Sequence, residues 1–146
     1  VIINGHLIGP LLAQPRQMLT RWREIVDPVA FDQVMRDNLS VLMISNPAAI
    51  DDLAVQLYSE DLRKARLRPI ALMDKRDDMI LTRLRTRTIC IAGEFDPIAS
   101  PSVEAQMAKL RAVRPDVETH VLPGIGHWAM YEGAPSMNAL LARVLA

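Results

Sequence analysis

Two residues in the second half of the chain have the chemistry and the placement of a proton-transfer pair. His127 lies in the segment Leu122-Pro123-Gly124-Ile125-Gly126-His127-Trp128, directly after the alternating run 117–122, which predicts a short strand. Imidazole has an unperturbed pKa of about 6.5, so it can accept and return a proton near neutrality. A histidine on the loop that ends a strand is therefore a candidate general base. The alternative interpretation is a histidine that only hydrogen-bonds within its own turn.

The candidate acid, Asp96, follows a second predicted strand over residues 88–92. This run of β-branched and small apolar residues, ended by glycine and then Asp-Pro, predicts a strand buried on both faces and followed by a turn. Ser100-Pro101 then predicts a helix start, with Val103, Met107 and Leu110 on one helical face. If the two strands are parallel neighbours, their carboxyl ends meet at one sheet edge, and Asp96 and His127 can lie together there.

In order and spacing, the segment from about Leu84 to Ala146 resembles the C-terminal end of an α/β-hydrolase. In that family a strand ending in G-x-x-D supplies an acid, and the last strand runs into a G-x-G-H loop that supplies a histidine. Residues 93–96 and 124–127 match these two motifs position by position. A predicted last helix fits as well, opened by Pro135 and carrying an apolar stripe of Met137, Leu140, Leu141, Val144 and Leu145.

The resemblance implies an α/β fold with a few parallel strands flanked by helices and a helical cap inserted between them. It also implies a nucleophile–His–Asp triad, in which Asp96 orients the imidazole and His127 is the base. Family members place the nucleophile on an earlier G-x-S-x-G elbow, but no serine of this chain has those flanking glycines. We therefore expect this chain to be the C-terminal portion of a longer hydrolase, with the N-terminal part of the same hydrolase supplying the nucleophile. Glu94 is the rival acid, although alternation along the strand end points it to the opposite side.

Applied to the hydrophobic spacing of the chain, the resemblance implies three regions. Residues 1–13 are expected to form a core strand and loop, residues 14–68 a helical cap or lid, and residues 69–146 the C-terminal part of the hydrolase core. In the resemblance, the strand in the first region ends near the active site, so His6 is a candidate substrate-binding residue. Trp128 is the other, because it follows the base directly and would line the pocket or pack against the cap.

Three helices are predicted in the cap. Met18, Leu19, Trp22 and Ile25–Val26 recur at helical spacing, Pro28 opens a second helix, and Asn46-Pro47 caps a third. The third is expected to carry one apolar stripe: Ile50, Leu53, Ala54, Leu57, Tyr58 and Leu62. A core position is favoured over a substrate contact for Trp22, Phe31, Met35, Met43 and Tyr58. The charged run 74–78 is expected to be a solvated link, followed by a short helix over 79–84.

Composition excludes several classes of partner. The chain has 17 basic and 17 acidic residues, which gives no support for binding nucleic acid or an acidic membrane. Charges interrupt every apolar run before it reaches the roughly 20 residues that span a bilayer. The single cysteine, Cys90, lies in an apolar strand and is expected to be a buried, inert thiol. We expect no metal site, no cofactor and a cytoplasmic location, and the open edges of a small sheet favour a homodimer.

The sequence thus favours a hydrolase acting on a small apolar ester or C–C bond substrate. His-Trp followed by Ala-Met-Tyr-Glu is similar to the ends of carbon–carbon-bond hydrolases that act on ring-cleavage products. The alternative is a non-catalytic binding or interaction module, or an inactive fragment of a hydrolase.

Overall fold

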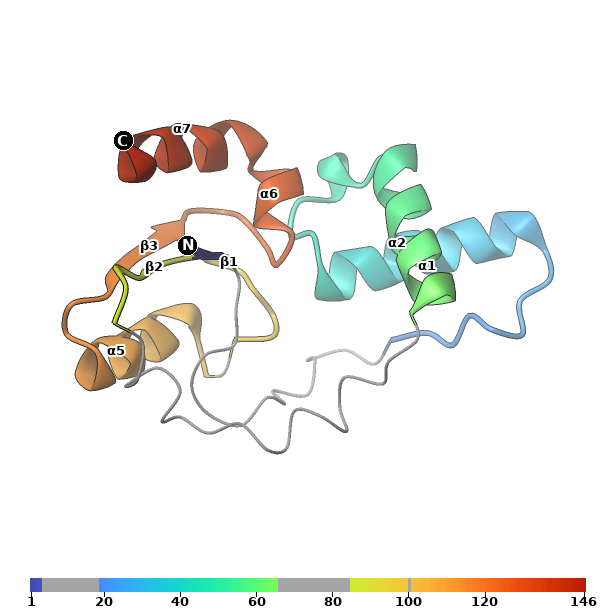
Figure 1. Cartoon of the computed structure of the whole chain (residues 1–146). Coiled ribbons are helices and arrows are strands. Elements are labelled where there is room, and N and C mark those ends of the chain that lie inside the picture. Colours follow the sequence, from blue (N-terminus) through green and yellow to red (C-terminus); the bar gives the residue numbers. More distant parts are fainter. Residues whose placement is uncertain (4–18, 66–84, 100) are drawn as a thin grey trace.

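A small parallel sheet with helices on both faces is the centre of the computed structural model, which describes residues 1–3, 19–65, 85–99 and 101–146 (Figure 1). Strands β1 (Ile2–Ile3), β2 (Ile89–Gly93) and β3 (Glu118–Leu122) pair in parallel in the order β1-β2-β3. Ile2 is opposite Cys90, and Ile91 is opposite His120. The expected α/β class, with few parallel strands flanked by helices, is confirmed.

The middle strand, β2, is buried along its whole length. Cys90 and Ala92 face helix α5 (Val103–Val113), whereas Ile89 and Ile91 face helix α7 (Ala134–Leu145) on the other side of the sheet. Because a helix covers each face, the strand is apolar at every position instead of alternating. The predicted stripe of the last helix is confirmed for Met137, Leu140 and Val144, which are buried. It is wrong for Leu145, which is exposed.

Helices α1 (Pro28–Leu42) and α2 (Asp52–Lys64) form a pair beside the sheet, joined through the short 3₁₀ helix η1 (Pro47–Ala49) (Figure 1). Asp27 caps α1 by accepting a hydrogen bond from the Ala30 amide, and Pro28 occupies the first turn. The pair has its own apolar core, in which Met35 and Leu39 are fully buried. Of the five residues for which a core position was favoured, Met35 and Tyr58 are buried in this core. The other three are partly buried and pack against it: Trp22, Phe31 and Met43.

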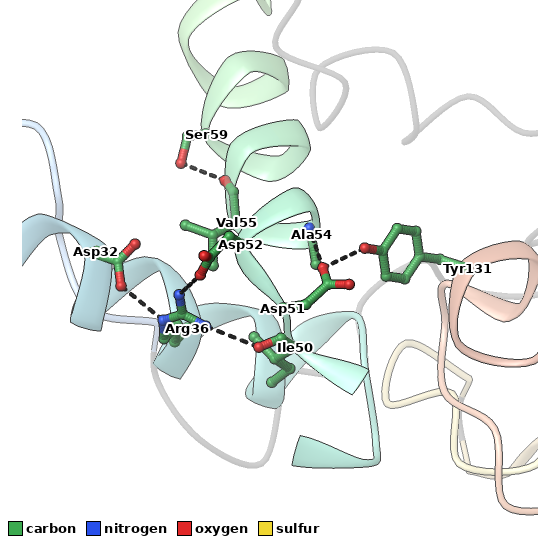
Figure 2. Close-up of polar contacts among 9 residues, drawn as sticks. All are labelled: Asp32, Arg36, Ile50, Asp51, Asp52, Ala54, Val55, Ser59 and Tyr131. Atoms are coloured by element: carbon green, nitrogen blue, oxygen red, sulfur yellow. Dashed lines mark hydrogen bonds and ion pairs between the residues drawn. The ribbon is translucent and has the colours of Figure 1, made fainter. Parts of the chain in front are cut away.

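Arg36 joins the two helices of the pair at the point where α2 begins, as Figure 2 shows. Its guanidinium contacts Asp32 one turn earlier at 2.7 Å, donates to the Ile50 carbonyl at 2.9 Å, and contacts Asp52 at 2.5 Å. The two carboxylates raise the pKa of Arg36, first through Asp32 and then through Asp52. Because the Arg36 guanidinium also donates to a backbone carbonyl, its orientation is fixed more firmly than an exposed ion pair alone would fix it.

Two predictions for the helical region are wrong. Residues 19–26 form a turn within irregular chain instead of a helix, and the Asn38 side chain bonds to both the amide and the carbonyl of Thr20. The predicted third helix is broken: Asn46 caps only η1, and Asp51 caps α2 separately. The predicted apolar stripe is confirmed for Ile50, Ala54, Tyr58 and Leu62, which lie in or against the core of the pair. It is wrong for Leu53 and Leu57, which are exposed, whereas Val55 is buried.

The remaining predictions concern the start of one helix and residues that the structure does not describe. Ser102 caps α5 in place of Ser100, with its hydroxyl accepting from the Ala105 amide at 3.2 Å. His6 and the predicted link and helix within 69–84 lie outside the described residues. Of the described helices, none combines the length and the apolar character needed to cross a membrane.

Candidate active site

Asp96 lies in the turn that follows β2, at the carboxyl edge of the sheet. Its carboxyl group is almost fully buried, with a side-chain exposure of 5%. Oδ1 accepts a hydrogen bond from the Ile98 amide at 2.9 Å, and the Ala99 amide donates to the Asp96 carbonyl at 3.2 Å. An aspartate that bonds to a backbone amide two residues later fixes its own turn. The carboxylate is therefore held in one orientation.

His127 lies in the loop after β3, and its ring meets that carboxylate. The imidazole Nδ1 is 2.8 Å from Asp96 Oδ2. An ionised carboxylate can only accept hydrogen bonds, so Nδ1 carries the proton, and in the neutral ring Nε2 then has the lone pair. The His127 side chain is 21% exposed, four times as much as that of Asp96. The structure thus brings together the two residues that the sequence singled out, with a carboxylate oxygen of Asp96 at hydrogen-bond distance from the His127 ring.

The acid loop and the histidine loop are joined by backbone hydrogen bonds. The Glu94 amide donates to the Leu122 carbonyl, and the Phe95 amide donates to the Ile125 carbonyl, both at 2.9 Å. Gly93 lies so close to the opposite loop that a Cβ at this position would meet the Gly126 carbonyl oxygen at 2.2 Å. The glycine of the G-x-x-D motif is therefore required by close approach of two backbones.

The other glycine of interest, Gly124, is required for conformation. Its φ of 72° lies in the left-handed region, and nothing lies within 4 Å of a Cβ placed there. Glu94, the rival acid, accepts a hydrogen bond from the Gly124 amide at 2.8 Å. Its carboxylate therefore stabilises the turn that leads to the histidine.

Trp128, the residue after the candidate base, packs against helices on both sides. Its ring makes an edge contact with Tyr58 of α2, with centroids 6.1 Å apart, and a tilted contact with Tyr131 of α6 (Ala129–Glu132) at 6.0 Å. Aromatic pairs at these separations contribute about 0.5–1.5 kcal/mol beyond their buried area. Trp128 therefore connects the histidine loop to the helical pair. His6, the other candidate substrate-binding residue, lies outside the described residues.

Tyr131 makes a second connection, between α6 and the helical pair, visible in Figure 2. Its hydroxyl donates to Asp51, the residue that caps α2, and the same carboxylate oxygen accepts from the Ala54 amide at 2.8 Å. The Tyr131 hydroxyl lowers the pKa of Asp51, with a smaller effect from the Ala54 amide, and Asp51 in turn raises the pKa of Tyr131.

An open groove of about 430 Å³ lies on the helical pair, lined partly by residues 19–24 together with Asn38, Tyr58 and Leu62. Tyr58 thus contacts both this groove and Trp128. Within the described ranges, no three His, Cys, Asp or Glu side chains are grouped closely enough to hold a metal ion.

Sequence reasoning missed Glu132 and Ser45, whose contacts hold the histidine loop. Glu132 Oε2 accepts from the Gly126 amide at 2.7 Å, and Oε1 is 2.7 Å from the Ser45 hydroxyl. Glu132 stands only five residues beyond His127, so a carboxylate one helical turn past a glycine-bracketed loop was the available signal. Ser45 gave none, because it is distant in the sequence.

The fold has solved counterparts among the α/β-hydrolases. A protein from Burkholderia cenocepacia with a provisional aryl esterase assignment is 15% identical over 98% of this chain and 52% of its own, with a TM-score of 0.71. A serine hydrolase involved in carbazole degradation is 22% identical over 76% of this chain and 46% of its own, with a TM-score of 0.58. The 2-hydroxy-6-oxo-6-phenylhexa-2,4-dienoate hydrolase from Rhodococcus sp. strain RHA1 is 16% identical over 99% and 54%, with a TM-score of 0.54.

These likenesses establish the fold of the chain, which spans about half the length of the solved structures it matches. No protein-family model matches the sequence. No curated protein matches it either.

Proposed function

We propose, on the premise that this chain has the fold of the C-terminal portion of an α/β-hydrolase, that it supplies the acid and the base of a hydrolase. The observation that carries the proposal is the 2.8 Å contact between Asp96 Oδ2 and His127 Nδ1 at the carboxyl ends of adjacent parallel strands. In an open α/β sheet this edge is where ligands bind. The buried carboxylate and the more exposed imidazole have the relative placement that proton transfer to a substrate requires.

In the proposed reaction His127 Nε2 removes the proton from a nucleophile provided by a part of the protein outside this chain. The nucleophile attacks the carbonyl carbon of the substrate, and the imidazolium then returns the proton to the leaving group. His127 next activates a water molecule, which releases the covalent intermediate and restores the nucleophile. Asp96 holds Nδ1–H throughout and stabilises the imidazolium, without itself taking the proton.

We further propose that residues 14–68 form the cap over this site and that the substrate is a small apolar molecule. The support comes from the apolar core of α1 and α2, from the Trp128–Tyr58 contact at the histidine loop, and from the groove beside Tyr58. The solved counterparts include a protein assigned to ester cleavage and a hydrolase of a phenyl-substituted dienoate. An ester or a C–C bond next to a carbonyl is accordingly the proposed target.

The test uses the natural gene product, its intact mass, and short p-nitrophenyl esters with and without a serine-directed phosphonate. We expect turnover that the phosphonate abolishes, and a labelled peptide from outside the 146 residues of this chain. Absence of turnover with esters and with carbon–carbon substrates would leave the alternative, a non-catalytic binding module. A label on a serine of this chain would contradict the assignment of the nucleophile.

A further inference from the structure

Glu132 occupies a position from which one carboxylate contacts two separate segments. Oε2 accepts from the amides of Gly126 and Ser45, at 2.7 and 3.1 Å. Oε1 accepts from the Asn46 amide at 2.6 Å and lies 2.7 Å from the Ser45 hydroxyl. Three of the four donors are backbone amides, whose positions define the path of the chain. Glu132 therefore joins the histidine loop to the connection 43–46 between α1 and η1 (Figure 1).

The same connection contacts the histidine loop on both sides of His127. On one side the Trp128 amide donates to the Met43 carbonyl at 2.8 Å. On the other side, a Cβ added to Gly126 would lie 2.9 Å from the Met43 carbonyl oxygen and from the Ser45 amide nitrogen. The backbone before and after the candidate base is thus set by a segment of the helical pair.

We infer that Glu132 is a positioning residue for His127, and that through it the placement of the helical pair determines the aim of the imidazole. This inference rests on the proposed function, because aiming the ring matters only where the ring transfers a proton. A displacement of the connection 43–46 moves the Gly126 and Trp128 backbone, and with them the ring that bonds to Asp96. When the helical pair is packed against the histidine loop, the His127 ring is therefore held against the Asp96 carboxylate.

The chemistry of the donors explains which of these contacts a carboxylate makes and which a glutamine could keep. An ionised carboxylate only accepts hydrogen bonds, so both of its oxygens suit amide donors. A glutamine has one accepting oxygen and one donating NH₂ group. If the glutamine oxygen accepts from the Gly126 and Ser45 amides, its NH₂ group faces the Asn46 amide. Both of these groups are donors, so no hydrogen bond forms between them. Glutamine can therefore keep the bond to the histidine loop while it loses the bond to Asn46.

The experiment compares Glu132→Ala, Glu132→Gln and the wild type by NMR in the natural gene product that contains this chain. The readout is the Nδ1 proton of His127, which a hydrogen bond to a carboxylate moves far downfield and protects from exchange. The chain has three histidines, so Asp96→Asn assigns the signal by removing it. Glu60→Gln is the matched control, because it removes a carboxylate that pairs with Lys64 on the surface of α2. All spectra are taken about 20 °C below the melting temperature of each variant.

We expect Glu132→Ala to abolish the downfield signal or speed its exchange by at least tenfold, and Glu132→Gln to retain it. A contribution to stability alone would lower the melting temperature and leave the signal of the folded protein unchanged, which would overturn the inference. Retention in Glu132→Ala, or equal loss in Glu60→Gln, would likewise overturn it. Should Glu132→Ala not fold, Ser45→Gly and Glu132→Asp take its place, and an unchanged signal in both overturns it. If Glu132→Ala loses the signal but the wild-type natural gene product shows no turnover, the positioning role of Glu132 stands and only the proposed function is refuted.

Discussion

Replacing Asp96 by asparagine is expected to reverse the tautomer of His127. The Asp96 carboxylate uses Oδ1 for the Ile98 amide and Oδ2 for the imidazole Nδ1. In Asp96→Asn, the single amide oxygen is retained by the Ile98 N–H, and the NH₂ group then points at the ring. Two donors cannot share one hydrogen bond, so Nδ1 must become the acceptor and the proton must move to Nε2. The nitrogen proposed as the base then has no lone pair.

The expected loss of rate follows from this change of tautomer. In serine proteases the equivalent substitution lowers kcat by about 10⁴-fold, and at 1.36 kcal/mol per tenfold this is about 5.4 kcal/mol of barrier. The free energy of unfolding should fall by less than about 2 kcal/mol, because the Ile98 hydrogen bond is kept and the side-chain volume is unchanged. A severe kinetic effect with a small effect on stability is therefore the specific expectation.

Two measurements check it. Steady-state turnover is measured in the natural gene product, and long-range ¹H–¹⁵N correlation spectra report the protonated ring nitrogen of His127 in this chain. Glu94→Gln is the matched control, because an amide oxygen at this position can still accept from the Gly124 amide, and we expect its rate within about tenfold of wild type. The reasoning is refuted if Asp96→Asn keeps the proton on Nδ1, or if Glu94→Gln loses as much rate as Asp96→Asn.

Three further predictions concern stability and reactivity. Gly93→Ala should lower the free energy of unfolding, measured in urea, by about 3 kcal/mol or more, because its Cβ would lie 2.2 Å from a backbone oxygen. Gly124→Ala should lower it by only about 1–2 kcal/mol, because the added Cβ meets conformational strain and no neighbouring atom. Equal losses for the two variants would contradict this. Because the Tyr131 hydroxyl lowers the pKa of Asp51, that carboxylate stabilises the fold fully above the ordinary aspartate range and less as pH falls through the lowered pKa. The melting temperature of Tyr131→Phe should therefore be below wild type at neutral pH, and the difference should close on acidification; a constant difference would count against it. Burial raises the pKa of the Cys90 thiol, so its reaction with a disulfide reagent should follow global unfolding, and rapid labelling of the folded chain would disprove this.

The sheet and the contact between Asp96 and His127 were predictable because their signals are local. The buried run before Gly93 and the glycine loop before His127 each specify a strand end within a few residues. Parallel neighbours then bring such ends to the same edge, so two local patterns were enough to place Asp96 against His127.

The contacts that hold the site could not be predicted in the same way. Glu132 bonds to Ser45, which is 87 positions away, and no periodicity records such a pairing. The stripe of α2 was wrong only at Leu53 and Leu57, because the buried face of the helix instead takes in Val55 and Ser59 beside Ala54 and Tyr58. Near Trp22, where a helix was expected, the Asn38 side chain instead bonds to the backbone of Thr20.

The connection 43–46 between α1 and η1 has a consequence for insertions and deletions. Surface connections between helices usually accept added residues, because few backbone groups there are committed. Here the Met43 carbonyl and the Ser45 and Asn46 amides are all bonded to the histidine loop or to Glu132. One added residue would put these groups out of register with their partners. A library that varies loop length in the helical pair should therefore leave 43–46 untouched.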